Sequence, residues 1–364
     1  MTADTVAVGQ ANVGPSPAAQ PDAKPGSRDG SAALAFAVFV PLLLLSVGLG
    51  VAVGRPVVLL VLAVVPILVR LRSRPIAAAA VMALAGAALR AALVGAAPET
   101  DQIETTLAAL RIVLQGGVPY GAGIAGTSTG APFPYGPLAL AAYVPGVWTE
   151  VLAAALTMLI LVRAKTVVGL AFYAACPLVV RGTLMGTNDV LPGLLVTTAV
   201  VLMPTRPRMA AAALAAAIAI KPYAGAWLPG LVGAGGIEFA VVFAGASAVF
   251  WAPLALWGIE PFMRSVSLAA AQHDTPANTF NLPLMRLLAV PLALAALLRA
   301  RSLAWQAALG AGVFLAVLFF DRWASLAYLL VPLPLLLIAI EQRAAGRVSR
   351  RRRAAIAARG LDGD

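Results

Sequence analysis

The chain has 364 residues, of which 61% are hydrophobic and only 11% charged. A soluble globular domain has about 45–50% apolar and about 25% charged residues, so the composition excludes that class and indicates a polytopic membrane protein. The apolar runs are continuous rather than alternating, which disfavours a membrane β-barrel. The formal net charge of +11 comes mainly from basic groups between apolar runs and at the C-terminal end. This distribution indicates membrane orientation rather than nucleic-acid binding.

Residues 1–31 are rich in Ala, Gly, Pro, Ser and Asp, which predicts a disordered tail. Residues 32–341 then predict an all-α transmembrane bundle. Several apolar runs are shorter than the roughly 20 residues that cross a bilayer untilted, and 209–220 and 223–235 could be re-entrant. We therefore expect ten to twelve spans among the runs 33–53, 56–69, 76–96, 137–162, 166–180, 189–203, 209–220, 223–235, 237–257, 281–298, 303–320 and 323–340.

The basic residues predict the orientation of this bundle. If the N-terminus is cytoplasmic, most of the 26 lysines and arginines fall in inner loops or in the basic tail 342–364. Because cytoplasmic loops are enriched in Lys and Arg, both termini are expected in the cytoplasm. Two long segments, 98–136 and 258–280, then lie outside, and loops of such length are often functional.

The first outer loop opens with an amphipathic pattern that predicts a helix over 101–115 along the membrane surface. Thr100 can cap this helix, Asp101 and Glu104 suit its positive N-terminal end, and Gly116 ends it. The two carboxylates share a face. Either they cap and solvate the helix, or one is a general base at the membrane–water boundary.

Other polar residues lie in short outer segments. Asn188 and Asp189 can cap the span that follows them, and Arg181 has no charge partner nearby in sequence. Lys221 ends an alanine-rich segment, where it either snorkels to the interface or meets a phosphate as a point charge.

The second outer loop contains His273, the only histidine, close to Arg264. This grouping is either exposed loop or a site for phosphate binding or proton transfer. Cys176 is the only cysteine, so an internal disulfide and a cysteine-cluster metal site are excluded, as is a multi-histidine metal site. Further along, Asp321 and Arg322 predict a local ion pair in an outer turn.

Carboxylates and cations therefore occur together on the outer side of a protein that otherwise avoids charge. Charged residues near lipid are costly and tend to be functional. A carboxylate base with nearby cations suits a substrate that carries a phosphate and reacts at a hydroxyl.

The order of these motifs resembles that of a known family. An outer-loop aspartate precedes a helix, a Gly-Gly-x-Pro-Tyr motif, a Gly- and Ser-rich linker and a Phe-Pro-Tyr-Gly-Pro-Leu segment that opens a span. This order is similar to that of the polyprenyl-phosphate-mannose-dependent mannosyltransferases of actinobacteria, multi-pass members of the GT-C glycosyltransferase superfamily. The residues that fill it are Asp101, Gly116, Gly117, Pro119, Tyr120, Tyr135, Pro137 and Leu138.

Three further segments agree with this resemblance, which covers about residues 76–340. Asn188-Asp189 resembles the family's turn before a span, and the alanine-rich segment ending in Lys221 resembles its lysine-terminated helix. Asn278-Thr-Phe-Asn281-Leu, followed by Arg286, resembles its Asn-Gln-Ser-Leu stretch with a following arginine.

The resemblance implies an inverting transfer of mannose, or a related sugar, from a polyprenyl-phosphate donor to a glycolipid or glycan at the outer face of the plasma membrane. Asp101 would deprotonate the acceptor hydroxyl, with Glu104 as the second candidate. Metal and cofactor are expected to be absent. The donor phosphate would be held by Lys221, Arg181, Arg264 and His273, and the substrates by Tyr120, Tyr135, Asn188, Asp189, Asn278 and Asn281.

Two other functions remain open from the sequence. A lipid-carrier flippase or transporter would place charges near the middle of its spans, where Glu150 is the plausible acid. A non-catalytic membrane subunit of cell-envelope assembly would tolerate replacement of Asp101.

Overall fold

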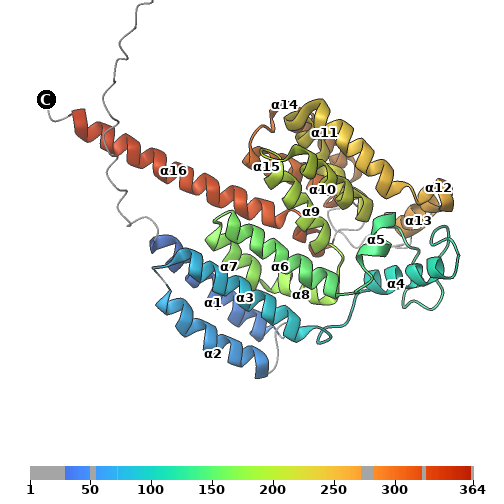
Figure 1. Cartoon of the computed structure of the whole chain (residues 1–364), viewed down its shortest axis with the longest axis horizontal. Helices are drawn as coiled ribbons and strands as arrows, with labels where there is room; N and C mark the ends of the chain where they lie inside the picture. Colours follow the sequence, from blue (N-terminus) through green and yellow to red (C-terminus); the bar gives the residue numbers. More distant parts are fainter. Residues whose placement is uncertain (1–28, 50–54, 72, 272–281, 322–324, 362–364) are drawn as a thin grey trace, which may run out of the picture.

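The computed structural model describes residues 29–49, 55–71, 73–271, 282–321 and 325–361 (Figure 1). Within these ranges the regular secondary structure is helical, and one isolated bridge joins Gly123 and Pro132 in the loop between α4 and α5. The expected all-α class is therefore confirmed for the described residues. The tail predicted for 1–31 lies almost wholly outside them, because the first helix begins at Asp29.

The helices follow the predicted apolar runs but are more often interrupted. The α-helices are α1 (Asp29–Gly48), α2 (Arg55–Arg70), α3 (Pro75–Leu93), α4 (Asp101–Leu114), α5 (Pro137–Ala142), α6 (Trp148–Arg163), α7 (Val167–Ala175), α8 (Pro177–Met185), α9 (Val190–Leu202), α10 (Pro207–Ile220), α11 (Leu228–Trp251), α12 (Leu254–Trp257), α13 (Ile259–Ala271), α14 (Ala289–Arg299), α15 (Leu303–Leu318) and α16 (Leu333–Leu361). The 3-10 helices η2 (Pro222–Trp227), η3 (Pro283–Leu288) and η4 (Leu326–Leu330) precede α11, α14 and α16.

Three helical stretches in the described part are long and apolar enough to cross a membrane, namely Ser31–Gly48, Pro75–Leu93 and Pro222–Trp251. The pair α7 and α8, bent by 53°, would make a fourth if it forms one broken span. The expected count of ten to twelve is not confirmed. The reason is local: Pro177 opens α8 and thereby divides one run, and the apolar helices α9, α10 and α15 have only 13, 14 and 16 residues.

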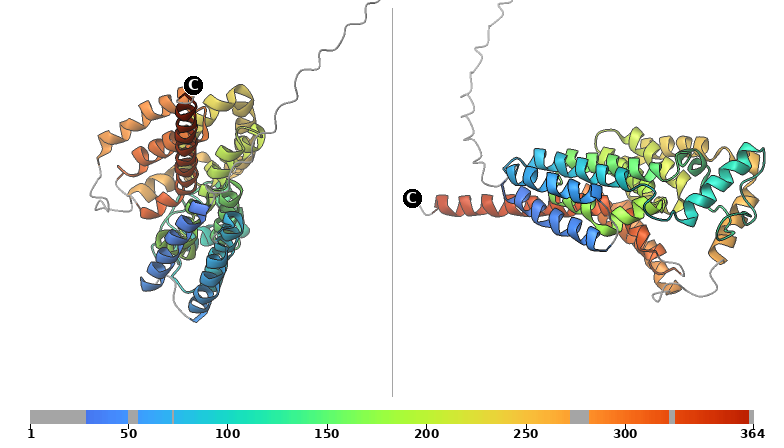
Figure 2. Two further views of the ribbon diagram at one scale, coloured as in Figure 1. Left: turned by 90° about the vertical axis from the view of Figure 1, so that its left-hand side faces the viewer. Right: turned by 90° about the horizontal axis from the view of Figure 1, so that it is seen from below.

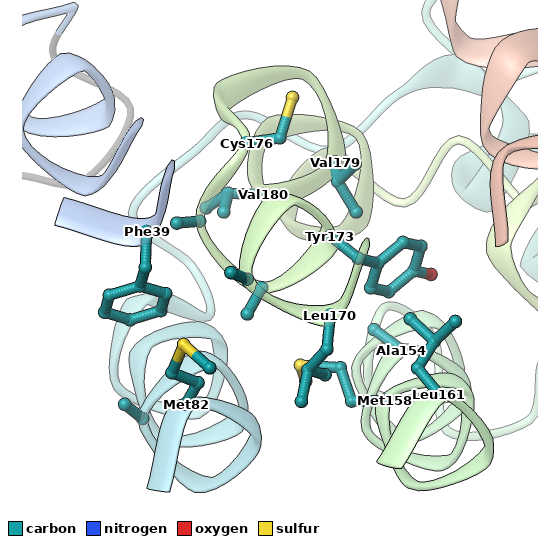
Figure 3. Packing of buried hydrophobic residues seen from close by; sticks show 14 of the residues in the cluster. Phe39, Met82, Ala154, Met158, Leu161, Leu170, Tyr173, Cys176, Val179 and Val180 are labelled. Carbon is teal, nitrogen blue, oxygen red and sulfur yellow. The ribbon is translucent and has the colours of Figure 1, made fainter. Parts of the chain in front are cut away.

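One hydrophobic core joins α1, α3, α6, α7 and α8 (Figure 3). Phe39, Met82, Met158 and Leu170 are almost fully buried in it. Gly86 lets α3 approach its neighbours, because a Cβ there would lie 2.9 Å from both Met158 Sδ and Ala174 Cβ. Small residues at such contacts are typical of helix packing in membranes, where close backbone approach gives dispersion and hydrogen bonding.

A second core joins α9, α10, η2, α11, α15 and α16 around the buried Trp227. Gly310 of α15 faces this indole, and a Cβ at Gly310 would lie only 2.2 Å from Trp227 Cδ1. Contacts between α9, α10 and α6 connect the two cores.

Buried charges hold both ends of α7. Arg90 donates hydrogen bonds to Tyr173 O at 3.1 Å and Ala174 O at 3.0 Å, at the C-terminal end of α7. Glu341 of α16 accepts from the amides of Val167 at 2.9 Å and Gly169 at 3.0 Å, at its N-terminal end. Each charge has the sign that stabilises its end of the helix dipole. The Arg90 side chain is fully buried.

The two ends of the molecule differ. At one end α16 extends beyond the other helices, so the basic tail from residue 342 to Leu361 is helical (Figure 2). At the opposite end lie α4, α5, α12 and α13 (Figure 1). Residues 98–136, and residues 258–271 of the second long segment, supply most of this second end, which contains the expected site residues of the first loop.

Candidate functional site

The helix expected over 101–115 is confirmed as α4, and Gly116, with φ of 80°, follows it. Thr100 precedes α4 but does not cap it. Its amide donates to Met185 O at 2.7 Å and its hydroxyl donates to Gly186 O at 2.7 Å. The start of α4 is thereby fixed on the turn between α8 and α9, with the exposed Asp101 as its first residue.

Close backbone packing seals this junction. Gly186 has φ of 67°, and an added Cβ would lie 2.5 Å from Ile103 Cγ1 of α4. A glycine is needed there both for the left-handed backbone and for the contact. The residues after Gly186 are Thr187, Asn188 and Asp189, so the sequence motif at 188–189 lies next to the start of α4.

The segment 133–138, expected to open a span, leads into the six-residue helix α5 and packs on the end of α10. The Gly136 amide donates to Ile220 O at 3.1 Å, and a Cβ at Gly136 would lie 2.2 Å from Ala219 O. The Tyr120 hydroxyl donates to Tyr135 O at 3.0 Å. Two motifs of the first loop are thus fixed beside Lys221, more than 80 residues away in sequence.

Lys221 and Asp189 form an ion pair that is almost completely buried. Lys221 Nζ lies 2.7 Å from Asp189 Oδ1, and the side chains are 3% and 0% exposed. The same ammonium donates to Thr187 O at 3.2 Å. It also lies 5.3 Å from the ring centroids of Tyr135 and Tyr223, within cation–π range.

The Tyr223 hydroxyl donates a hydrogen bond to Asp189 Oδ1. We call Tyr135, Asn188, Asp189, Lys221 and Tyr223 the Lys–Asp cluster. Burial excludes the interpretation that Lys221 snorkels to the interface.

The interpretation that Asp189 caps the next helix is also wrong. Asp189 precedes α9, but its side chain makes no capping hydrogen bond. Glu150 of α6 supplies the cap instead: its Oε2 accepts from the amides of Asp189 at 3.2 Å and Val190 at 2.9 Å, and its Oε1 from Leu191 at 3.2 Å. The Tyr143 hydroxyl donates to Glu150 Oε1 at 2.7 Å. Because Glu150 fills the capping role, Asp189 is free to bind Lys221.

The cluster retains unused hydrogen-bonding capacity. Among the described residues, Asp189 Oδ2 and Thr187 Oγ1 are buried without a hydrogen-bond partner. Asn188, held at φ of 48°, is also fully buried, and its amide approaches the Tyr135 hydroxyl without completing a well-formed hydrogen bond. Buried polar atoms are normally paired, so a set of unpaired ones beside an ion pair suits a ligand rich in hydroxyls.

Electrostatics connects Asp101 to this cluster. Burial raises the pKa of the Tyr135 hydroxyl, the Asn188 side chain lowers it, and the charges of Asp189 and Asp101 raise it further. The backbone places Asp101 near the cluster: the hydroxyl of the preceding residue, Thr100, donates to Gly186 O at 2.7 Å, two residues before Asn188. Asp101 combines this proximity with an exposed carboxylate, which a general base needs in order to meet an acceptor.

Glu104, the second candidate base, is engaged elsewhere. Its two oxygens accept from the Ser128 amide, each at 3.0 Å, and the Ser128 hydroxyl donates to it as well. These hydrogen bonds lower the pKa of Glu104. The carboxylate thus holds the Gly-rich linker 121–131 against α4.

Among the remaining expected residues, Arg181 and Arg264 do not join the cluster. Arg181 is exposed on α8, with Nε 3.3 Å from Met185 Sδ. Arg264 is exposed on α13, whose buried Ser265 Oγ accepts from the Gly121 amide at 2.9 Å. Asp321 accepts from Arg286 at 3.1 Å, whereas its expected partner lies outside the described residues. His273, Asn278 and Asn281 also lie outside the described residues.

The sequence analysis did not identify three tyrosines that lie in or against the site: Tyr143, Tyr223 and Tyr328. The Tyr328 ring packs edge-on against Tyr223, with centroids 5.7 Å apart. Tyr223 directly follows the Lys221-Pro222 pair, which was a usable signal. Tyr328 lies in η4 and nothing in its sequence context points to the site.

The chain matches no family model, and no curated protein or solved structure is significantly similar to it.

Proposed function

We propose that this chain is an inverting glycosyltransferase with GT-C-like architecture and cytoplasmic termini. It would transfer mannose or a related sugar from a polyprenyl phosphate to a glycolipid or glycan hydroxyl at the outer face of the plasma membrane. One observation supports it most: an exposed aspartate at the start of a surface helix is fixed beside the buried Lys–Asp cluster, and both come from motifs in the family-like order.

The proposed reaction uses Asp101 as the base. Asp101 takes the proton of the acceptor hydroxyl as the oxygen attacks the anomeric carbon. The bond between that carbon and the phosphate oxygen breaks, and the polyprenyl phosphate leaves with the electron pair. Attack from the face opposite the leaving group inverts the anomeric centre. The unpaired polar atoms of Thr187, Asn188 and Asp189 suit sugar hydroxyls.

The geometry modifies the proposed role of Lys221. Because Asp189 neutralises its charge at 2.7 Å, Lys221 can bind a phosphate only by exchanging this carboxylate. We therefore assign to Lys221 the positioning of the 187–189 segment. Arg181 and Arg264, whose side chains are exposed, are the described candidates for the charge of the donor phosphate.

The test is transfer of radiolabelled mannose from polyprenyl-phosphate-mannose in membranes that contain the protein and lipid acceptors from its host. Asp101→Asn should fold and lose at least 100-fold in rate, as expected for loss of a general base. Glu99→Gln is the matched control, since Glu99 is an exposed carboxylate two residues away, and it should retain the wild-type rate.

Equal rates for the two variants would show that Asp101 is only a surface residue at the start of α4. Absence of transfer by wild type with this donor, and with other polyprenyl-phosphate sugars, would contradict the proposal and favour the transporter or the non-catalytic subunit.

A further inference from the structure

A cleft of about 470 Å³ lies between the start of α15 and the middle of α16, from Gln342 to Arg350. Arg343, Arg347 and Arg350 line one wall. Their spacing of four and three residues places them on one face of the helix. The first turn of α15, beginning at its cap Ser302, lines the opposite wall. Among the described residues of this lining, none is acidic.

The positive charge of this cleft is not neutralised by the nearest acid on α16. Glu341 directs its carboxylate to the amides at the start of α7, as with Val167 at 2.9 Å. The start of α15 adds the positive end of its helix dipole to the three guanidinium groups. Arginine presents a planar set of donors that matches the oxygens of a phosphate.

The residues around the cleft favour a lipid over a soluble ion. The apolar stretch 333–340 of α16 ends just before the cleft, so the three arginines follow directly on an apolar segment. Trp305, which is 48% exposed, lies at the same level, and the Arg343 guanidinium is 5.5 Å from its ring centroid. Tryptophan and basic residues together are typical of the headgroup region.

We propose that this cleft binds the phosphate of an anionic phospholipid headgroup, on the side that the charge distribution predicts to be cytoplasmic. This inference is independent of the proposed transferase site, which is built from other elements: the start of α4, the turn between α8 and α9, and the end of α10.

The experiment is native mass spectrometry of the full-length protein in non-ionic detergent. The probes are short-chain phosphatidylglycerol, short-chain phosphatidylcholine and inorganic phosphate. The test variant is the triple Arg343→Gln/Arg347→Gln/Arg350→Gln. The control triple, Arg70→Gln/Arg74→Gln/Arg163→Gln, removes three exposed arginines from loops that are predicted to lie on the same side.

Each basic residue near an anionic lipid contributes about a fivefold gain in affinity, so the test triple should bind phosphatidylglycerol about 100-fold more weakly. The control triple should stay within about threefold of wild type, and phosphatidylcholine should bind much more weakly than phosphatidylglycerol.

Equal losses in both triples would overturn the proposal, as would unchanged binding in the test triple. Full displacement of the lipid by millimolar phosphate would assign the cleft to a soluble anion instead. If the test triple elutes aggregated, Arg347→Gln alone should still weaken binding about fivefold, and no change would count against the site.

Discussion

Removal of one partner from the Lys221–Asp189 pair should be strongly destabilising. The two atoms are 2.7 Å apart and the side chains are 3% and 0% exposed, so neither charge can be solvated when the other is lost. Breaking a buried ion pair in this way costs about 3–5 kcal/mol of unfolding free energy. Lys221→Met and Asp189→Asn should each show a loss of this size.

The double variant Lys221→Met/Asp189→Asn separates the interaction energy of the pair from the contribution of each side chain alone. With both charges gone, no uncompensated charge remains, so most of the single-variant loss should be recovered. The coupling between the two positions should then exceed about 2 kcal/mol, which is within the range for residues in direct contact. The measurement is far-UV circular dichroism during SDS titration of the protein in mixed micelles.

An exposed ion pair in the same chain is the matched control. Arg208 Nε and Glu238 Oε1 lie 2.8 Å apart, with side chains 77% and 51% exposed. Water screens this pair, so Arg208→Met, Glu238→Gln and the double variant should each change stability by only about 0–1 kcal/mol. Losses below 1 kcal/mol for Lys221→Met, or additive effects at the buried pair, would refute the reasoning.

Two further predictions concern the first long loop. Gly136→Ala should cost about 1–3 kcal/mol in thermal unfolding, since the new Cβ meets the Ala219 carbonyl oxygen at 2.2 Å. Gly245→Ala, whose Cβ would have no atom within 4 Å, should be neutral or stabilising. A loss of stability equal to that of Gly136→Ala would show that the contact with the Ala219 carbonyl is not the cause. The lowered pKa of Glu104 means that its bonds to Ser128 stabilise the fold above the pKa of an unfolded glutamate, about 4.3, and that this stabilisation is lost as the pH falls through the lower folded value. Proteolysis within 121–131 should therefore accelerate below about pH 4 in wild type. Ser128→Ala removes the hydroxyl donor but keeps the amide donor, so it should reduce this dependence, and an unchanged pH profile in the variant would contradict the assignment.

The sequence by itself determined the class of the protein and much of its local structure. Composition and continuous apolar runs indicated a helical membrane protein. These properties can be read from the residues alone, because they do not depend on which residues come into contact in the fold. The surface helix α4 was predicted almost to its ends, since an amphipathic pattern and a terminating Gly116 are local signals.

Only the tertiary structure decided which polar groups meet. Capping of α9 belongs to Glu150 rather than Asp189, and this choice depends on how α6 packs against α9. Lys221 is paired and buried because the turn before α9 lies against the end of α10, a contact between residues 32 positions apart. Sequence patterns report the periodicity of one element at a time, whereas the partner of a buried charge is set by packing between elements. That is why the candidate residues could be found in the sequence but their pairing could not.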